Sequence, residues 1–145
     1  MTSRIALPDV NVLVALAWPN HRHHQAAVGW FTRESALGWA TTPVTESGFV
    51  RVSSNRQALP AATSPVIAVD QLRLLSALPG HVFWPDTVRF VAADDVLPRL
   101  RGHRQVTDAH LVTLARHHGG VLVTFDQGLA GWGGDVVALL EPDGP

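Results

Sequence analysis

The sequence lacks both cysteine and lysine over its 145 residues. Without cysteine, the protein can form neither disulfide bonds nor thiolate metal sites. Because all 11 basic residues are arginine, every permanent side-chain cation is a planar guanidinium suited to phosphate or carboxylate. The formal net charge of −1 gives the whole molecule no attraction for nucleic acid. The arginines are unevenly distributed, however, and three of them cluster in "RLRGHR" at 99–104.

Long hydrophobic runs are also missing. No apolar stretch reaches the ~18 residues that a membrane-spanning helix needs. The apolar N-terminal stretch is interrupted by Pro8, Asp9 and Asn11, and no small-residue cleavage site follows it, which argues against a signal peptide. The hydrophobic content of 46% is ordinary for a folded protein. The sequence therefore predicts one domain over residues 1–145 and a cytoplasmic location.

Strand-like and helix-like segments alternate along the chain. The continuous apolar run "VLVT" at 121–124 is typical of a buried parallel strand, whereas Thr42-Pro43 and Ser64-Pro65 are typical helix starts. The alternation predicts a three-layer α/β/α sandwich with a mostly parallel sheet of about four to five strands. The expected strands are 4–7, 38–42, 81–84, 121–126 and 135–140. The expected helices begin after Asp9, at His23, after Thr42, after Ser64, at Asp86 and at the cap Thr107.

Four carboxylates are expected at the edge where the strands of this sheet end. Asp9 follows the first strand and Asp126 follows the "VLVT" strand, so both lie at the carboxyl edge. Glu46 and Asp108 lie in the first turns of helices, and helices in such folds begin at that same edge. Each residue has an ordinary explanation by itself, such as a helix cap, a turn or an interaction with the helix dipole.

The combination is harder to explain without a ligand. Four carboxylates at one spot repel each other and raise one another's pKa, so a fold keeps them together only around a cation. Hard oxygen ligands in a chain without cysteine point to Mg²⁺ or Mn²⁺.

Four sequence blocks resemble the PIN domain, and more narrowly the VapC toxins of bacterial VapBC toxin–antitoxin systems. The blocks are "PDVNVLVAL", "TESGFVRV", "TDAHLVTLA" and "VTFDQGL", and they occur in the family's order between residues 4 and 130. The resemblance implies a PIN-like fold and a toxin that acts as an endoribonuclease on RNA. It also implies a homodimer and a VapB-type antitoxin as partner. The residues that it implies for metal binding and catalysis are Asp9, Glu46, Asp108 and Asp126, with Asn11, Thr107 and Thr124 in supporting positions.

Such a site would hydrolyse a phosphodiester with a metal-activated water. One or two Mg²⁺ ions lower the pKa of the attacking water and neutralise charge on the phosphate. We expect Asp9 to be the central ligand, with Asp108 and Asp126 completing the metal shell. Glu46 is expected to be a ligand or a base that orients the water. The expected products carry 5′-phosphate and 3′-hydroxyl ends.

A cluster of acids repels RNA, so cations have to hold the phosphates on either side of the cleaved bond. The arginines closest in sequence to the acidic motifs, together with the "RLRGHR" cluster, are the natural candidates. The candidates for RNA binding are Arg51, Arg56, Arg99, Arg101 and Arg104.

Two other functions are compatible with parts of the sequence. The eight histidines, which include those of "HRHH" at 21–24, offer acid and base groups for a metal-independent ribonuclease. A PIN-like module that binds RNA without cleaving it is the other alternative, although the presence of all four acids argues against it. A phosphatase of the haloacid dehalogenase type is disfavoured, because it needs a second Asp where this chain has Asn11, and a lysine.

Overall fold

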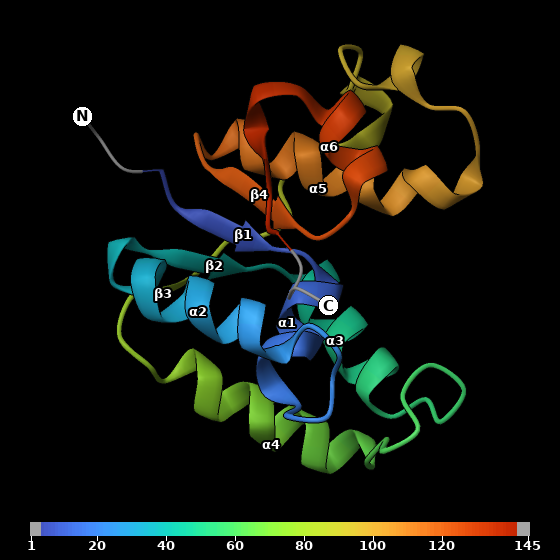
Figure 1. Cartoon of the computed structure of the whole chain (residues 1–145). Coiled ribbons are helices and arrows are strands. Elements are labelled where there is room, and N and C mark those ends of the chain that lie inside the picture. The colour runs from blue at the N-terminus through green and yellow to red at the C-terminus, as the bar shows by residue number, and fades with distance from the viewer. Residues whose placement is uncertain (1–3, 142–145) are drawn as a thin grey trace.

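A central parallel sheet organises the molecule. The computed structural model describes residues 4–141, and within them five short strands form one sheet (Figure 1). The strands are β1 (Ala6–Pro8), β2 (Trp39–Thr41), β3 (His81–Phe83), β4 (Val121–Thr124) and β5 (Val137–Leu139). Their order is β3-β2-β1-β4-β5, and each neighbouring pair is parallel. The predicted number and direction of the strands are therefore confirmed.

Helices cover both faces of the sheet, as the three-layer prediction requires. They are α1 (Val10–Ala17), α2 (His24–Glu34), α3 (Pro43–Ser53), α4 (Pro65–Ser76), α5 (Val106–His117) and α6 (Gln127–Gly133). Helices α1 to α4 lie on one face, and α5 and α6 lie on the other (Figure 1). No helix within residues 4–141 is both long and apolar enough to cross a membrane.

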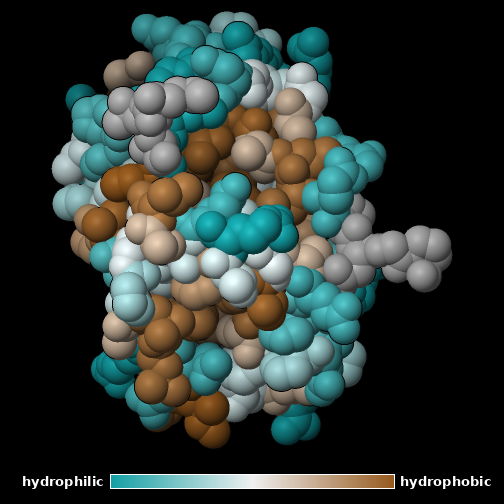
Figure 2. Space-filling model, turned by 60° about the vertical axis from the view of Figure 1, so that its left-hand side comes forward, coloured by the Kyte–Doolittle hydropathy of each residue, from teal (hydrophilic) through white to brown (hydrophobic). Residues whose placement is uncertain are grey.

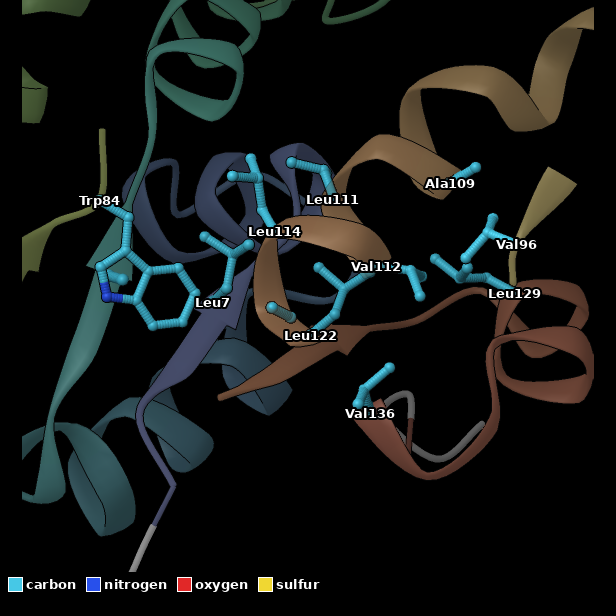
Figure 3. Close-up of a cluster of buried hydrophobic side chains, with 12 residues drawn as sticks. Leu7, Trp84, Val96, Ala109, Leu111, Val112, Leu114, Leu122, Leu129 and Val136 are labelled. Carbon is cyan, nitrogen blue, oxygen red and sulfur yellow. The ribbon is translucent and has the colours of Figure 1, made fainter. Parts of the chain in front are cut away.

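The core has a separate cluster on each face of the sheet, because successive strand residues point in opposite directions. Leu7 and Leu122 pack with Leu111 and Leu114 of α5 (Figure 3). On the other face, the fully buried Trp39 packs with residues of α1, α3 and α4. The centre of the sheet is thus fixed from both sides, which holds the ends of β1 and β4 in place.

Two helix starts form as the sequence predicts. Thr42 accepts a hydrogen bond from the Thr45 N–H through its hydroxyl, and the Thr45 hydroxyl accepts one from the Thr42 N–H. Ser64 caps α4 by accepting from the N–H of Ile67. In each case a proline occupies the first turn, where its missing N–H is not needed.

Two predictions about the second half of the chain are wrong. The helix expected at 86–92 is only a single 3₁₀ turn, Phe90–Ala92. Tertiary contacts outweigh the local tendency there, since the Asp86 carboxylate contacts the Nε2 atom of His110 at 2.9 Å and the segment packs over α5. Thr107 is not the cap of α5, because the helix already begins at Val106 and the preceding Gln105 makes no side-chain capping bond.

Candidate active site

Asp9 lies at the junction of β1 and α1, at the carboxyl edge of the sheet. It caps α1, since its Oδ1 atom accepts a hydrogen bond of 3.0 Å from the N–H of Val12. Its Oδ2 atom accepts a second bond, of 2.5 Å, from the hydroxyl of Thr124 at the end of β4. The side chain is only 6% exposed. Asp9 is thus both a helix cap and a buried side chain. Capping uses only its Oδ1 atom, so it does not account for the Oδ2 atom.

Thr124 joins two of the predicted acids. Its hydroxyl donates to Asp9 and accepts a bond of 3.0 Å from the backbone N–H of Asp126. Asp126 in turn caps α6, because its Oδ1 atom accepts from the N–H of Leu129. Strands β1 and β4 are direct neighbours, with Pro8 opposite Val123. The pairing of these strands therefore brings Asp9 and Asp126 to the same edge.

Asp108 reaches the same place from the first turn of α5. It is partly buried and lines a cavity of about 210 Å³ together with Asp9, Asn11, Arg51 and Thr107. Burial raises the pKa of Asp108, and the charge of Asp126 raises it further. The structure thus brings three of the four predicted carboxylates close enough to influence one another.

The electrostatics of Asp9 are dominated by its burial. Loss of hydration raises its pKa to about 6. The hydrogen bonds from Thr124 and Val12 act in the opposite direction, and the charges of Asp108 and Asp126 raise the pKa again. A negative charge is consequently unfavourable at this position unless a cation compensates for it.

Glu46 lies in the first turn of α3 with different partners. Its Oε2 atom accepts a 2.7 Å hydrogen bond from the Thr41 hydroxyl, which also contacts the Nε2 atom of His81 at 2.8 Å. Because the single hydroxyl proton goes to Glu46, the His81 Nε2–H has to donate to Thr41. Burial lowers the pKa of His81, and the nearby Glu46 raises it in part. Glu46 is not among the charges that act on Asp9.

A complete metal cage is not preformed. Within the part of the chain that the structure describes, no three His, Asp or Glu side chains come close enough together to hold a metal ion. The donor set nevertheless suits a hard divalent cation, because Asp9, Asp108 and Asp126 all offer carboxylate oxygens and Asp9 is buried.

The predicted RNA-binding arginines fall into different environments. Arg51 is exposed and lines the cavity that contains Asp9 and Asp108. Arg99 donates from Nη1 to the carbonyl oxygen of Trp132, which gives it a structural contact. The remaining three, Arg56, Arg101 and Arg104, are exposed.

A second cavity beside the acids involves residues that sequence reasoning did not place there. It measures about 430 Å³ and is lined by Asn11, His21, Arg22, His23, Phe125 and Asp126. In the sequence, the "HRHH" segment offers only histidines as possible acid and base groups. Its position next to Phe125 depends on tertiary contacts, so no local signal revealed it.

Comparison with known proteins identifies the class to which this fold and site belong. A family model described as PIN domain matches residues 6–132, and the chain belongs to this family. The recognition of the four sequence blocks as PIN-like is therefore confirmed.

Particular relatives narrow the class further. The chain is 55% identical to Ribonuclease VapC39 of Mycobacterium tuberculosis (strain CDC 1551 / Oshkosh) over 127 residues, which are 86% of this chain and 91% of the relative. It is 54% identical to Ribonuclease VapC38 of strain ATCC 25618 / H37Rv over 125 residues, covering 86% of this chain and 87% of the relative. Ribonuclease VapC29 of strain CDC 1551 / Oshkosh is 41% identical over 134 residues, covering 92% and 95%. Within the PIN-domain family, the chain groups with the VapC ribonucleases.

Proposed function

We propose that this protein is the toxin of a type II toxin–antitoxin system and an endoribonuclease that requires Mg²⁺ or Mn²⁺. The observation that carries the proposal is the meeting of the buried Asp9 with Asp108 and Asp126 at the carboxyl edge of the sheet. Relatives named as ribonucleases over nearly the whole chain support the same activity.

Asp9, Asp108 and Asp126 would hold the metal after a shift of their side chains, because no three acids in the described residues lie close enough to do so as they stand. A divalent cation bound there supplies a Lewis acid that lowers the pKa of water and neutralises negative charge on a phosphate. Thr124 fixes the orientation of the Asp9 carboxylate through the 2.5 Å hydrogen bond. Because the same hydroxyl binds the Asp126 backbone N–H, it also keeps the two acids in register.

Other side chains around the acids act on the RNA. Arg51 supplies a cation beside Asp9 and Asp108, where it pairs with a phosphate oxygen. Asn11 and Thr107 line the same cavity and offer hydrogen bonds to phosphate. Glu46 remains in the proposal as a ligand or as the base that orients the attacking water, and its Oε2 atom accepts from the Thr41 hydroxyl. The products would carry 5′-phosphate and 3′-hydroxyl ends.

The proposal extends to partners and location. A VapB-type antitoxin would be the protein partner, and the protein would act in the cytoplasm on RNA. We also propose a homodimer, supported by large apolar side chains at the surface: Val66 is 71% exposed, Leu74 67% and Phe83 49%. Apolar areas separated by polar residues are visible on the face shown in Figure 2. Light scattering coupled to size exclusion tests the dimer.

Cleavage of cellular RNA tests the activity. Purified protein should cut RNA in Mg²⁺ or Mn²⁺, stop in EDTA and recover when metal is restored. Asp9→Asn should abolish cleavage and relieve growth arrest on expression, because the neutral amide cannot bind the metal in the same way. Activity that survives EDTA, or products with 2′,3′-cyclic phosphate ends, would instead indicate the histidine mechanism. RNA binding without cleavage by the wild type would indicate a non-catalytic module.

A further inference from the structure

The 430 Å³ cavity next to Asp126 has the properties of a ligand-binding pocket. We call it the histidine pocket, after His21 and His23, which line it with Asn11, Arg22, Phe125 and Asp126. Its volume lies in the range of about 300–1,000 Å³ that is usual for small-molecule sites. It combines a cation, aromatic rings and hydrogen-bonding groups, which together suit a nucleotide.

Three hydrogen bonds hold the loop that forms one wall. The His21 N–H donates to the carbonyl oxygen of Trp18, and the His24 N–H donates to that of His21. The Nδ1 atom of His24 donates to the Ala15 carbonyl oxygen at 2.7 Å, because a carbonyl can only accept. These bonds tie the loop to α1 and the start of α2, which sets the position of this wall.

His21 offers a defined hydrogen-bond donor. Its Nδ1 atom accepts a 3.0 Å bond from the backbone N–H of His23, so the neutral ring carries its proton on Nε2. Burial lowers the pKa of His21, as do the charges of His23, Arg22 and His24, and the neutral ring is therefore favoured. The Nε2–H remains available for an acceptor such as a phosphate oxygen or a base oxygen.

His23 of the loop and Phe125 form an aromatic surface next to Asp126. The rings of His23 and Phe125 lie 4.8 Å apart between centroids at an angle of 32°. Phe125 directly precedes Asp126, so this contact joins the loop to the turn that carries a candidate metal ligand. Aromatic rings of this kind stack on unpaired RNA bases without strong sequence preference.

Asn11 connects the two cavities of the site. It lines the histidine pocket together with Asp126, and it lines the smaller cavity together with Asp9 and Asp108. Arg51 lines the cavity that contains Asp9 and Asp108, and Arg22 lines the cavity that contains Asp126, so an RNA strand that passes from one cavity to the other would meet both guanidinium groups. Both flanking phosphates then meet a guanidinium, which offsets the repulsion by the acids.

We propose that the histidine pocket binds one nucleotide of the RNA next to the cleaved phosphodiester. Arg22 and the His21 Nε2–H contact its phosphate, and the rings of His23 and Phe125 contact its base. This inference rests on the proposed ribonuclease function. It adds the site that holds the nucleotide next to the cleaved bond.

Kinetics with a short RNA that contains a mapped cleavage site test the arginine. Arg22→Ala should raise KM about tenfold with little change in kcat, because it removes one charged contact to the bound strand. The slope of log(kcat/KM) against log[salt] should become shallower by about 0.7, as expected for one lost phosphate contact on a single strand. Arg33→Ala is the matched control, since Arg33 is an exposed arginine in the last turn of α2.

Shortening the RNA one nucleotide at a time locates the contact. For the wild type, KM should rise when the nucleotide that occupies the pocket is removed. For Arg22→Ala, the same shortening should raise KM by a smaller factor, because the variant has already lost one of the contacts that the truncation removes.

A variant of His21 separates binding from folding. His21→Asn keeps an acceptor for the His23 N–H but has no group at the position of the Nε2–H, so KM should rise severalfold while Tm stays unchanged. Equal KM for Arg22→Ala and Arg33→Ala would overturn the inference. An Arg22→Ala variant with the wild-type KM for RNA but weaker antitoxin binding would also overturn the inference, because it would assign the pocket to the protein partner. Failure of the wild type to cleave any RNA would instead reject the proposed function itself.

Discussion

The carboxyl group of Asp9 is held by good hydrogen bonds in a place that disfavours its charge. Its pKa of about 6 lies above the ordinary value of 3.8, so the folded state takes up a proton more readily than the unfolded chain. Ionised Asp9 therefore lowers the free energy of unfolding above pH 6, and this effect disappears as the pH falls toward 4. Between these values, this residue makes the metal-free protein less stable as the pH rises.

Asp9→Asn isolates this effect. In EDTA at pH 7, the variant should be more stable than the wild type by on the order of 3 kcal/mol, because the amide carries no charge to bury. Asparagine still offers a carbonyl oxygen to cap α1. Urea unfolding measures the difference, which should shrink as the pH is lowered from 7 to 5. Equal free energies of unfolding for the wild type and Asp9→Asn at pH 7 would contradict the destabilisation by ionised Asp9.

Thr124 is the second residue on which the site depends. Thr124→Val removes the hydroxyl that binds both Asp9 and the Asp126 N–H in a fully buried position. The free energy of unfolding should fall by about 1–3 kcal/mol, since buried polar atoms lose their partner, and cleavage should drop strongly. Thr124→Ser is the control because it keeps the hydroxyl. Denaturant titration and cleavage rates measured together check both effects, and equal behaviour of the two variants would exclude a role for the hydroxyl.

At the scale of elements, the approach of α3 to α1 places Arg51 beside Asp9. Gly48 of α3 makes this approach possible, because a Cβ atom there would lie 2.6 Å from the Cγ2 atom of Val10. The two helices therefore touch at a point one residue away from Asp9. The spacing of these helices is part of the geometry of the site.

Gly48→Ala should separate α1 from α3. We expect a loss of about 1–3 kcal/mol in the free energy of unfolding, which is typical of an overpacked core, together with a reduced cleavage rate. Gly131→Ala in α6 is a matched control, since its Cβ would meet no atom within 4 Å, and it should keep or slightly raise the stability. Thermal unfolding distinguishes the two, and an unchanged Tm for Gly48→Ala would show that the helices adjust freely.

The elements that could be predicted are those with local signals. Thr42-Pro43 and Ser64-Pro65 start helices through contacts within four residues, and apolar runs mark the buried strands. The 3₁₀ segment after Trp84 could not be predicted, because the contact between Asp86 and His110 spans distant parts of the chain. Part of the site could be predicted, because the alternation of strands and helices places Asp9 and Asp126 at the carboxyl edge of the sheet. The Glu46–Thr41–His81 contacts and the histidine pocket could not be predicted, because they join residues that are distant in the sequence.

For the molecule as a whole, metal binding and stability are linked. The acids repel one another in the folded state, and a cation that binds only this state shifts the equilibrium toward it. Mg²⁺ or Mn²⁺ should therefore raise the Tm of the wild type, by an amount equivalent to about 2.7 kcal/mol when the metal is present at 100 times its Kd. Differential scanning fluorimetry across a metal titration measures this.

Asp9→Asn serves as the control for that titration and should show a much smaller shift. A Tm of the wild type that stays flat in both metals would count against a shared site at the three carboxylates.

The organisation of residues 1–145 as a single domain stays a prediction, which limited proteolysis can examine.

The hydrogen bond between Thr124 and Asp9 spans 115 positions of the chain. During synthesis, Asp9 leaves the ribosome long before Thr124, the residue that orients its carboxylate. A growing or prematurely terminated chain therefore carries the central acid without its partner strand, and it has no assembled site. The site is therefore complete only once Thr124 has been synthesised and β4 has paired with β1.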